Sequence, residues 1–210
     1  GEVDKLIAYL REAGAKGTGD RVTNAFGMQF NPEVPACEAN IITAYLKAFL
    51  CLFDWLSARA DINMTRRLTS YVDPFPGLYV KKLVQTDYWP DMAGLIDDYL
   101  EANPTRNRAL DMLPLFKHID EQRVLGKVSD ELIKSRPTFH YRLPDCLIDQ
   151  PDWGVHVAWN DWVEVERLAA DPQRLEKCCR AYALYLDKSV GRLLHNWEDE
   201  VQQKWLSGAT

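Results

Sequence analysis

Apolar residues recur at helical spacing along most of the chain. The clearest stripe runs through residues 36–59, where its members are Ile41, Ile42, Tyr45, Leu46, Phe49, Leu52, Phe53 and Leu56. This spacing predicts a long helix with a broad core-facing side. Shorter stripes predict helices over 2–13, from Pro90 to about 101 and over 160–170. A last helix starts at Pro172 and, if it continued unbroken to Trp205, would be roughly 50 Å long.

Two stretches alternate instead, which is typical of strands with one buried face. They are residues 21–31 and residues 138–143, the second flanked by Pro137 and Pro144. On a strand, Thr138, His140 and Arg142 share one face, and Phe139, Tyr141 and Leu143 share the other. The polar face is either a site held over the core or the solvated side of an edge strand, and the pattern alone leaves both open.

Strands beside long helices predict an α+β fold, with an antiparallel sheet containing both alternating stretches and helices packed on one face. We divide the chain into an N-terminal helix with a glycine-rich connector (1–20), an α+β domain (21–170) and a long C-terminal helix (171–210). At 210 residues the chain can bury a sizeable core.

Charge and cysteine content narrow the partners and the compartment. The formal net charge of −6 disfavours a general nucleic-acid or anionic-membrane binder. Lys47 and Asp54 interrupt the most apolar run, 41–56, which is too short to span a bilayer. Five cysteines with no CxxC pair argue against a disulfide framework or a zinc site, so we expect a reducing, cytoplasmic location.

The loop at 103–108 is a second polar candidate. It contains Arg106, Asn107 and Arg108 just before an apolar run. Guanidinium groups suit carboxylate and phosphate oxygens because their donors form a fixed fork. The alternative is helix capping by Asn103 with salt bridges to nearby acids.

Three stretches in order, residues 26–33, 103–115 and 136–145, resemble the amidoligase family, which is similar to glutamine synthetase and γ-glutamylcysteine ligase. The resemblance covers about 24–185. It implies a glutamine-synthetase-like fold and an ATP-dependent carboxylate–amine ligase. Such enzymes phosphorylate a carboxylate, use Mg²⁺ or Mn²⁺, and let an amine displace the phosphate. The partners would then be a small-molecule or peptide carboxylate and an amine.

The resemblance also implies roles for residues. Relatives often read Glu-x-Arg on the strand matching 140–142, with Glu on metal; here His140 stands in place of that Glu, and Arg142 keeps its place. Relatives often read His-x-His or His-x-Asn where this chain has Gln29-Phe30-Asn31. The resulting assignments are Arg142, Arg136 and His140 for catalysis; Arg106, Asn107, Arg108, Gln29 and Asn31 for substrate or nucleotide; and Glu33 and His140 for metal.

Relatives begin with a strand carrying a metal-binding Glu-x-Glu pair, which is not visible within residues 1–19. We therefore expect a chain that lacks this N-terminal strand, either as a fragment or as a degenerate member. Two other functions remain open: a non-catalytic binding protein that forms a homodimer through its C-terminal helix, and a hydrolase with His140 as general base. The hydrolase lacks a G-x-S-x-G nucleophile motif.

Overall fold

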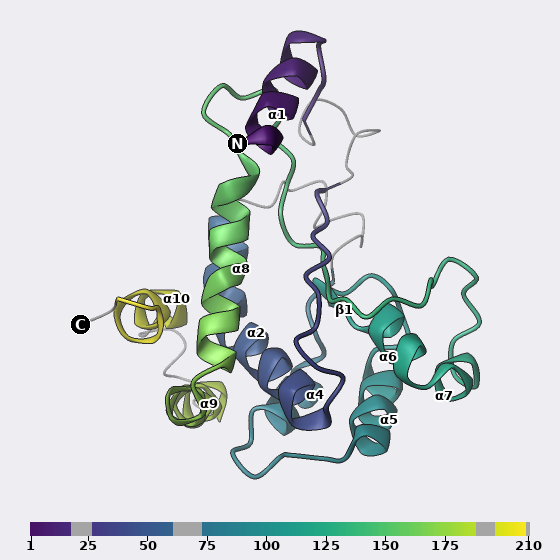
Figure 1. Ribbon diagram of the computed structural model, residues 1–210. Coiled ribbons are helices and arrows are strands. Elements are labelled where there is room, and N and C mark those ends of the chain that lie inside the picture. Colours follow the sequence, from purple (N-terminus) through teal and green to yellow (C-terminus); the bar gives the residue numbers. More distant parts are fainter. Residues whose placement is uncertain (18–26, 61–72, 188–195, 209–210) are drawn as a thin grey trace.

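The computed structural model describes residues 1–17, 27–60, 73–187 and 196–208 (Figure 1). Its elements, in order, are α1 (Glu2–Glu12), α2 (Ala39–Arg59), α4 (Gly77–Leu83), α5 (Met92–Ala102), β1 (Leu110–Asp111), α6 (Leu113–Ile119), α7 (Glu121–Leu125), β2 (His140–Tyr141), α8 (Val155–Ala169), α9 (Pro172–Asp187), α10 (Trp197–Glu200) and the π-helical turn η3 (Val201–Trp205). The fold is α+β as predicted, although it is mostly helical.

Helix α2 is the centre of the molecule. It packs against α8, α9, α10, α4 and α5, and the α2–α8 pair runs side by side in Figure 1. By length and composition α2 could cross a membrane, but 67% of its most apolar window is buried inside the protein. The helix continues through Lys47, which is buried. The Lys47 ammonium group has partners there, since its Nζ donates to the Gln85 carbonyl (2.7 Å) and lies 4.2 Å from the centre of the Trp89 ring. The core helix predicted from the stripe is confirmed.

The antiparallel pairing is present but short. β1 pairs with β2 so that Asp111 lies opposite His140. On the other side of β2, single bridges join Phe30 to Tyr141 and Glu33 to Thr138. Both bridges share one register, which places Asn31 opposite His140. The predicted strands are therefore too long as stated, residues 21–26 lie outside the described part, and the glutamine-synthetase-like fold is not confirmed.

Three prolines in this ladder contribute backbone carbonyls that accept hydrogen bonds but no N–H groups that donate them. Pro137 and Pro144 have no N–H to give, yet their carbonyls accept from Val34 N (3.1 Å) and Met28 N (2.9 Å). Pro32 accepts in the same way from Phe139 N, at 2.9 Å. The residues around β2 are thus held in an extended ladder, although only short pieces qualify as strands.

The prediction of one unbroken C-terminal helix, roughly 50 Å long, is wrong. Asn196 has an extended backbone (φ −90°, ψ 116°), and its side chain accepts from Glu198 N to start α10 as a separate helix. The Trp197 and Val201 side chains are buried. The Trp197 indole packs beside α2, where its Nε1 donates to the Cys51 carbonyl at 2.8 Å.

Three local expectations also need correction. Pro90 lies ahead of α5, which Asp91 caps by accepting from Gly94 N (2.8 Å). Asn103 closes α5 instead of starting a following helix. Helix α1 forms as expected, but Leu6 on its apolar face is 56% exposed. Arg11 attaches α1 to the loop before α8 through the carbonyls of Ile148, Pro151 and Trp153.

Candidate functional site

The strand alternation around β2 separates a buried face from a polar one. Phe139, Tyr141 and Leu143 are at most 1% exposed and belong to the core. His140 and Arg142 are half-buried on the opposite face. We call the side chains of Gln29, Asn31, Asp111, His140 and Arg142 on this face the polar row. The alternation predicted which side chains share this face, whereas the pairing with β1 was not expected from it.

His140 is the centre of the polar row. Gln29 Nε2 donates to Asn31 Oδ1 (2.6 Å) and contacts His140 Nδ1 (3.0 Å). The other ring nitrogen, His140 Nε2, is buried and has no hydrogen-bond partner in the described part of the chain. Burial, followed by the positive charges of Arg136, Arg142 and Arg106, lowers the pKa of His140 from 6.5 to about 4. The imidazole is therefore neutral at pH 7.

Arginines surround the polar row from three segments. Arg142 Nη1 donates to the carbonyl of Arg106, so strand and loop are joined directly. The Arg106 Nε pairs with Asp130 at 2.7 Å. Arg136 is exposed, and its backbone N–H donates to the Pro114 carbonyl (3.1 Å), which fixes the entry to the strand. The positive charges of Arg136, Arg142 and Arg106 all act on His140 and lower its pKa.

The remaining loop candidates have structural partners. Arg108 Nε donates to Asn103 Oδ1 (2.9 Å), and its Nη1 donates to the Pro74 carbonyl (2.6 Å). The Asn107 carbonyl accepts from Asp73 N at 2.6 Å. Both residues tie the loop to residues 73–74. Their assignment to substrate binding stays a prediction that these contacts do not support.

Asp111 is a candidate that the sequence reasoning missed. It lies opposite His140, is 3% exposed, and accepts a hydrogen bond from Leu113 N (3.0 Å). Burial raises its pKa from 3.8 to about 7, although that hydrogen bond and the charges of Arg142 and Arg106 act in the opposite direction. The available signal was a lone acid within the apolar run 109–116, where an ionisable group is costly to bury.

The metal ligands expected from the resemblance do not assemble here. Within residues 1–17, 27–60, 73–187 and 196–208, no three His, Cys, Asp or Glu side chains form a group suited to a metal ion. Glu33 is exposed, and its backbone pairs with Thr138, beyond the end of β2. Magnesium prefers carboxylate oxygens, whereas His140 is surrounded by guanidinium groups. The described residues therefore do not fit Mg²⁺ or Mn²⁺.

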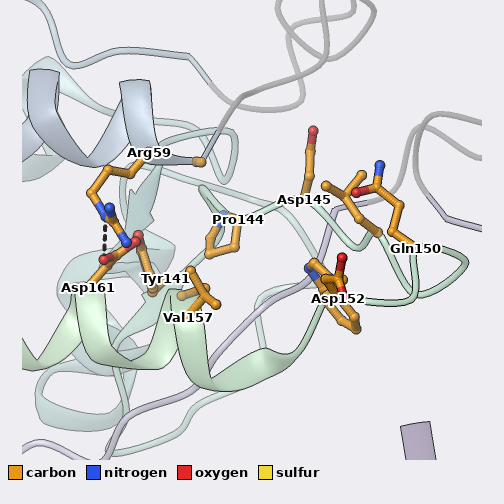
Figure 2. A pocket seen from close by; sticks show the side chains of 12 residues that line it. Arg59, Tyr141, Pro144, Asp145, Gln150, Asp152, Val157 and Asp161 are labelled. Carbon is orange, nitrogen blue, oxygen red and sulfur yellow. Dashed lines mark hydrogen bonds and ion pairs between the residues drawn. The ribbon is translucent and has the colours of Figure 1, made fainter. Parts of the chain in front are cut away.

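A cavity of about 250 Å³ opens on the other side of β2 (Figure 2). Tyr141, Pro144 and the α8 residues Val157 and Asp161 line it, and Asp161 Oδ1 accepts from Arg59 Nε at 2.6 Å. A further cavity of about 270 Å³ is lined by residues of α2, α4 and α9. The polar row lines neither, so the expected concave pocket over His140 and Arg142 is not seen at these two places.

Comparison with known proteins identifies the class to which this chain belongs. A family model described as "Putative amidoligase enzyme" matches residues 1–164 of the 210. The chain belongs to this amidoligase family, and the resemblance noted in the sequence is confirmed. No curated protein and no solved structure matches the chain significantly.

Proposed function

We propose that this protein joins a carboxylate to an amine at the expense of ATP, through an acyl phosphate. The observation that carries the proposal is the polar row of a family member: a ladder around β2 that holds His140 and Arg142 on one face, where Arg142 Nη1 donates to the Arg106 carbonyl. Phosphoryl transfer places negative charge on oxygens, and fixed guanidinium groups stabilise such charge.

The proposed reaction has two steps. A substrate carboxylate oxygen attacks the γ-phosphorus of ATP and ADP leaves, which forms the acyl phosphate. The amine nitrogen then attacks the acyl carbon, inorganic phosphate leaves, and the amine gives up a proton. Arg142 and Arg136 offset the charge on the transferred phosphoryl group, and Arg106 holds the carboxylate. Asp111 lies beside them with a pKa near neutrality, which suits a group that takes up the amine's proton.

The test is ADP release from ATP with a panel of amino acids and amines, comparing the natural chain with Arg142→Ala. Removing one preorganised donor from developing charge should lower the turnover rate by roughly 100-fold or more. Arg180→Ala is the matched control, because Arg180 is an exposed residue of α9 paired only with Glu176 at 2.7 Å among the described residues.

Equal loss of turnover in both variants would contradict the assignment of Arg142. ADP release that does not depend on both an acid and an amine would contradict ligation itself. Hydrolysis of an ester or amide without ATP would support the hydrolase instead. That reaction needs a ring nitrogen of His140 with a free lone pair, and the hydrogen bond from Gln29 occupies the one at Nδ1.

A further inference from the structure

The hydrogen bond from Gln29 determines which nitrogen of His140 carries the proton. An amide Nε2 has two hydrogens and no lone pair to share, so it can only donate. His140 Nδ1 must therefore accept at 3.0 Å. In a neutral imidazole the proton then lies on Nε2. This N–H is buried and has no acceptor in the described structure, and leaving a buried donor without an acceptor costs free energy.

The charges around this N–H indicate which kind of ligand could accept its hydrogen bond. Arg106, Arg136 and Arg142 act on His140, and Asp130 balances Arg106 through its ion pair. Asp111, the acid opposite His140, accepts a hydrogen bond from Leu113 N at 3.0 Å. A protonated Nε2 among guanidinium groups repels a cation and attracts an anion.

We propose that the polar row binds an oxyanion, either a carboxylate or a phosphate, directly and without a divalent metal, with His140 Nε2 as a hydrogen-bond donor to it. The inference deepens the proposed ligase by assigning this face to its acid or phosphoryl group, and it rests on that function only for the identity of the oxyanion.

Calorimetry on the whole chain tests the proposal, with inorganic phosphate and acetate titrated separately, in EDTA and again in magnesium. We expect one or both anions to bind equally well in the two conditions. The titration that shows binding identifies the source of the oxyanion. His140→Phe keeps a ring but removes the N–H, and should weaken binding roughly tenfold or more. His140→Gln keeps a donor near Nε2 and should retain most of the affinity.

Two further variants make the comparison sharper. His156→Phe makes the same chemical change at an exposed position of α8 and should leave binding unchanged. His140→Glu offers only acceptors and should abolish anion binding in EDTA. Absence of binding to either anion, binding that requires magnesium, or natural affinity in His140→Phe would each overturn the proposal.

Nitrogen NMR of the histidine rings gives a readout independent of affinity. The chain has four histidines, and the His140→Gln spectrum identifies the His140 signals by their loss. We expect a protonated Nε2 and an unprotonated Nδ1, with the Nε2–H resonance shifting on anion addition. The opposite tautomer would overturn the proposal. Neither measurement contains ATP, so anion binding without ligase turnover would refute the proposed function alone.

Discussion

At the scale of single residues, two neighbours across one strand pair have pKa values displaced in opposite directions. Asp111 and His140 lie opposite each other, and burial disfavours the charged form of both. The pKa of the acid rises to about 7 and that of the imidazole falls to about 4. Near pH 6 the row therefore holds two mostly neutral groups among arginines, which leaves its net charge positive.

Asp111 should make the protein less stable as pH rises. Between pH 3.8 and about 7 the native state binds more protons at this carboxyl than the unfolded state, so the free energy of unfolding falls with pH across that window. Asp111→Asn cannot ionise and keeps an oxygen for Leu113 N. Relative to the natural chain it should gain stability between pH 5 and pH 8, up to roughly 4 kcal/mol over the full window.

Urea unfolding at pH 5 and pH 8 measures this difference. Asp87→Asn, at an exposed position, is the control and should alter the free energy of unfolding by the same small amount at both values of pH. A pH-independent difference between the natural chain and Asp111→Asn would show that Asp111 is ionised in the native protein throughout this range.

At the scale of elements, α10 is a short helix whose Trp197 side chain is buried in the core. Trp197 is 1% exposed, its Nε1 donates to the Cys51 carbonyl (2.8 Å), and its ring stacks on Tyr182 and Tyr185. Even with the π-helical turn η3 that follows it directly, α10 is too short to be stable through its own hydrogen bonds. The contact with α2 is therefore what fixes α10 in place.

Trp197→Phe should lower the free energy of unfolding by roughly 1–3 kcal/mol, because it removes packed atoms and the hydrogen bond that the Cys51 carbonyl accepts from the indole. Trp159→Phe is the matched control, since Trp159 is 42% exposed on α8 and should change stability by about 0.5 kcal/mol or less. Urea unfolding followed by circular dichroism measures both. Equal effects of the two substitutions would mean that α10 is not anchored through Trp197.

At the scale of the whole molecule, the described elements depend on α2. Helices from both the middle and the end of the chain pack on it, and many of its side chains are fully buried. The predicted homodimer remains untested. Its motivation was a protruding C-terminal helix, and the burial of Trp197 and Val201 removes that motivation.

Hydrogen exchange should be slowest in the middle of α2, at about residues 42–56, because opening these amides requires the surrounding helices to separate. The amides of α1, whose side chains are mostly exposed, should exchange much faster. Mass spectrometry of peptides after timed exchange resolves the two regions. Protection of α1 equal to that of α2 would contradict a core organised on α2.

The spacing of apolar residues along the sequence was sufficient to predict the central helix and the two faces of the strand around His140. The stripe of 36–59 required a buried helix, and alternation at 138–143 assigned Tyr141 to the core and His140 to the polar face. These results follow from residue spacing alone, since the helical and extended periods differ. Membership of the amidoligase family likewise followed from the chain's own motifs, and the match over residues 1–164 confirmed it.

Only the tertiary structure decided which polar residues meet. It placed Asp111 opposite His140 across β1 and β2, directed Arg108 toward Asn103 and Pro74, and folded Trp197 back onto α2. Strand register, the burial of a charge and the return of a chain segment depend on contacts between residues that are distant in the sequence, whereas the Arg108–Asn103 hydrogen bond spans only five positions. The hydrogen bond between Gln29 and His140 is of the same kind, since it joins residues that are 111 positions apart in the sequence.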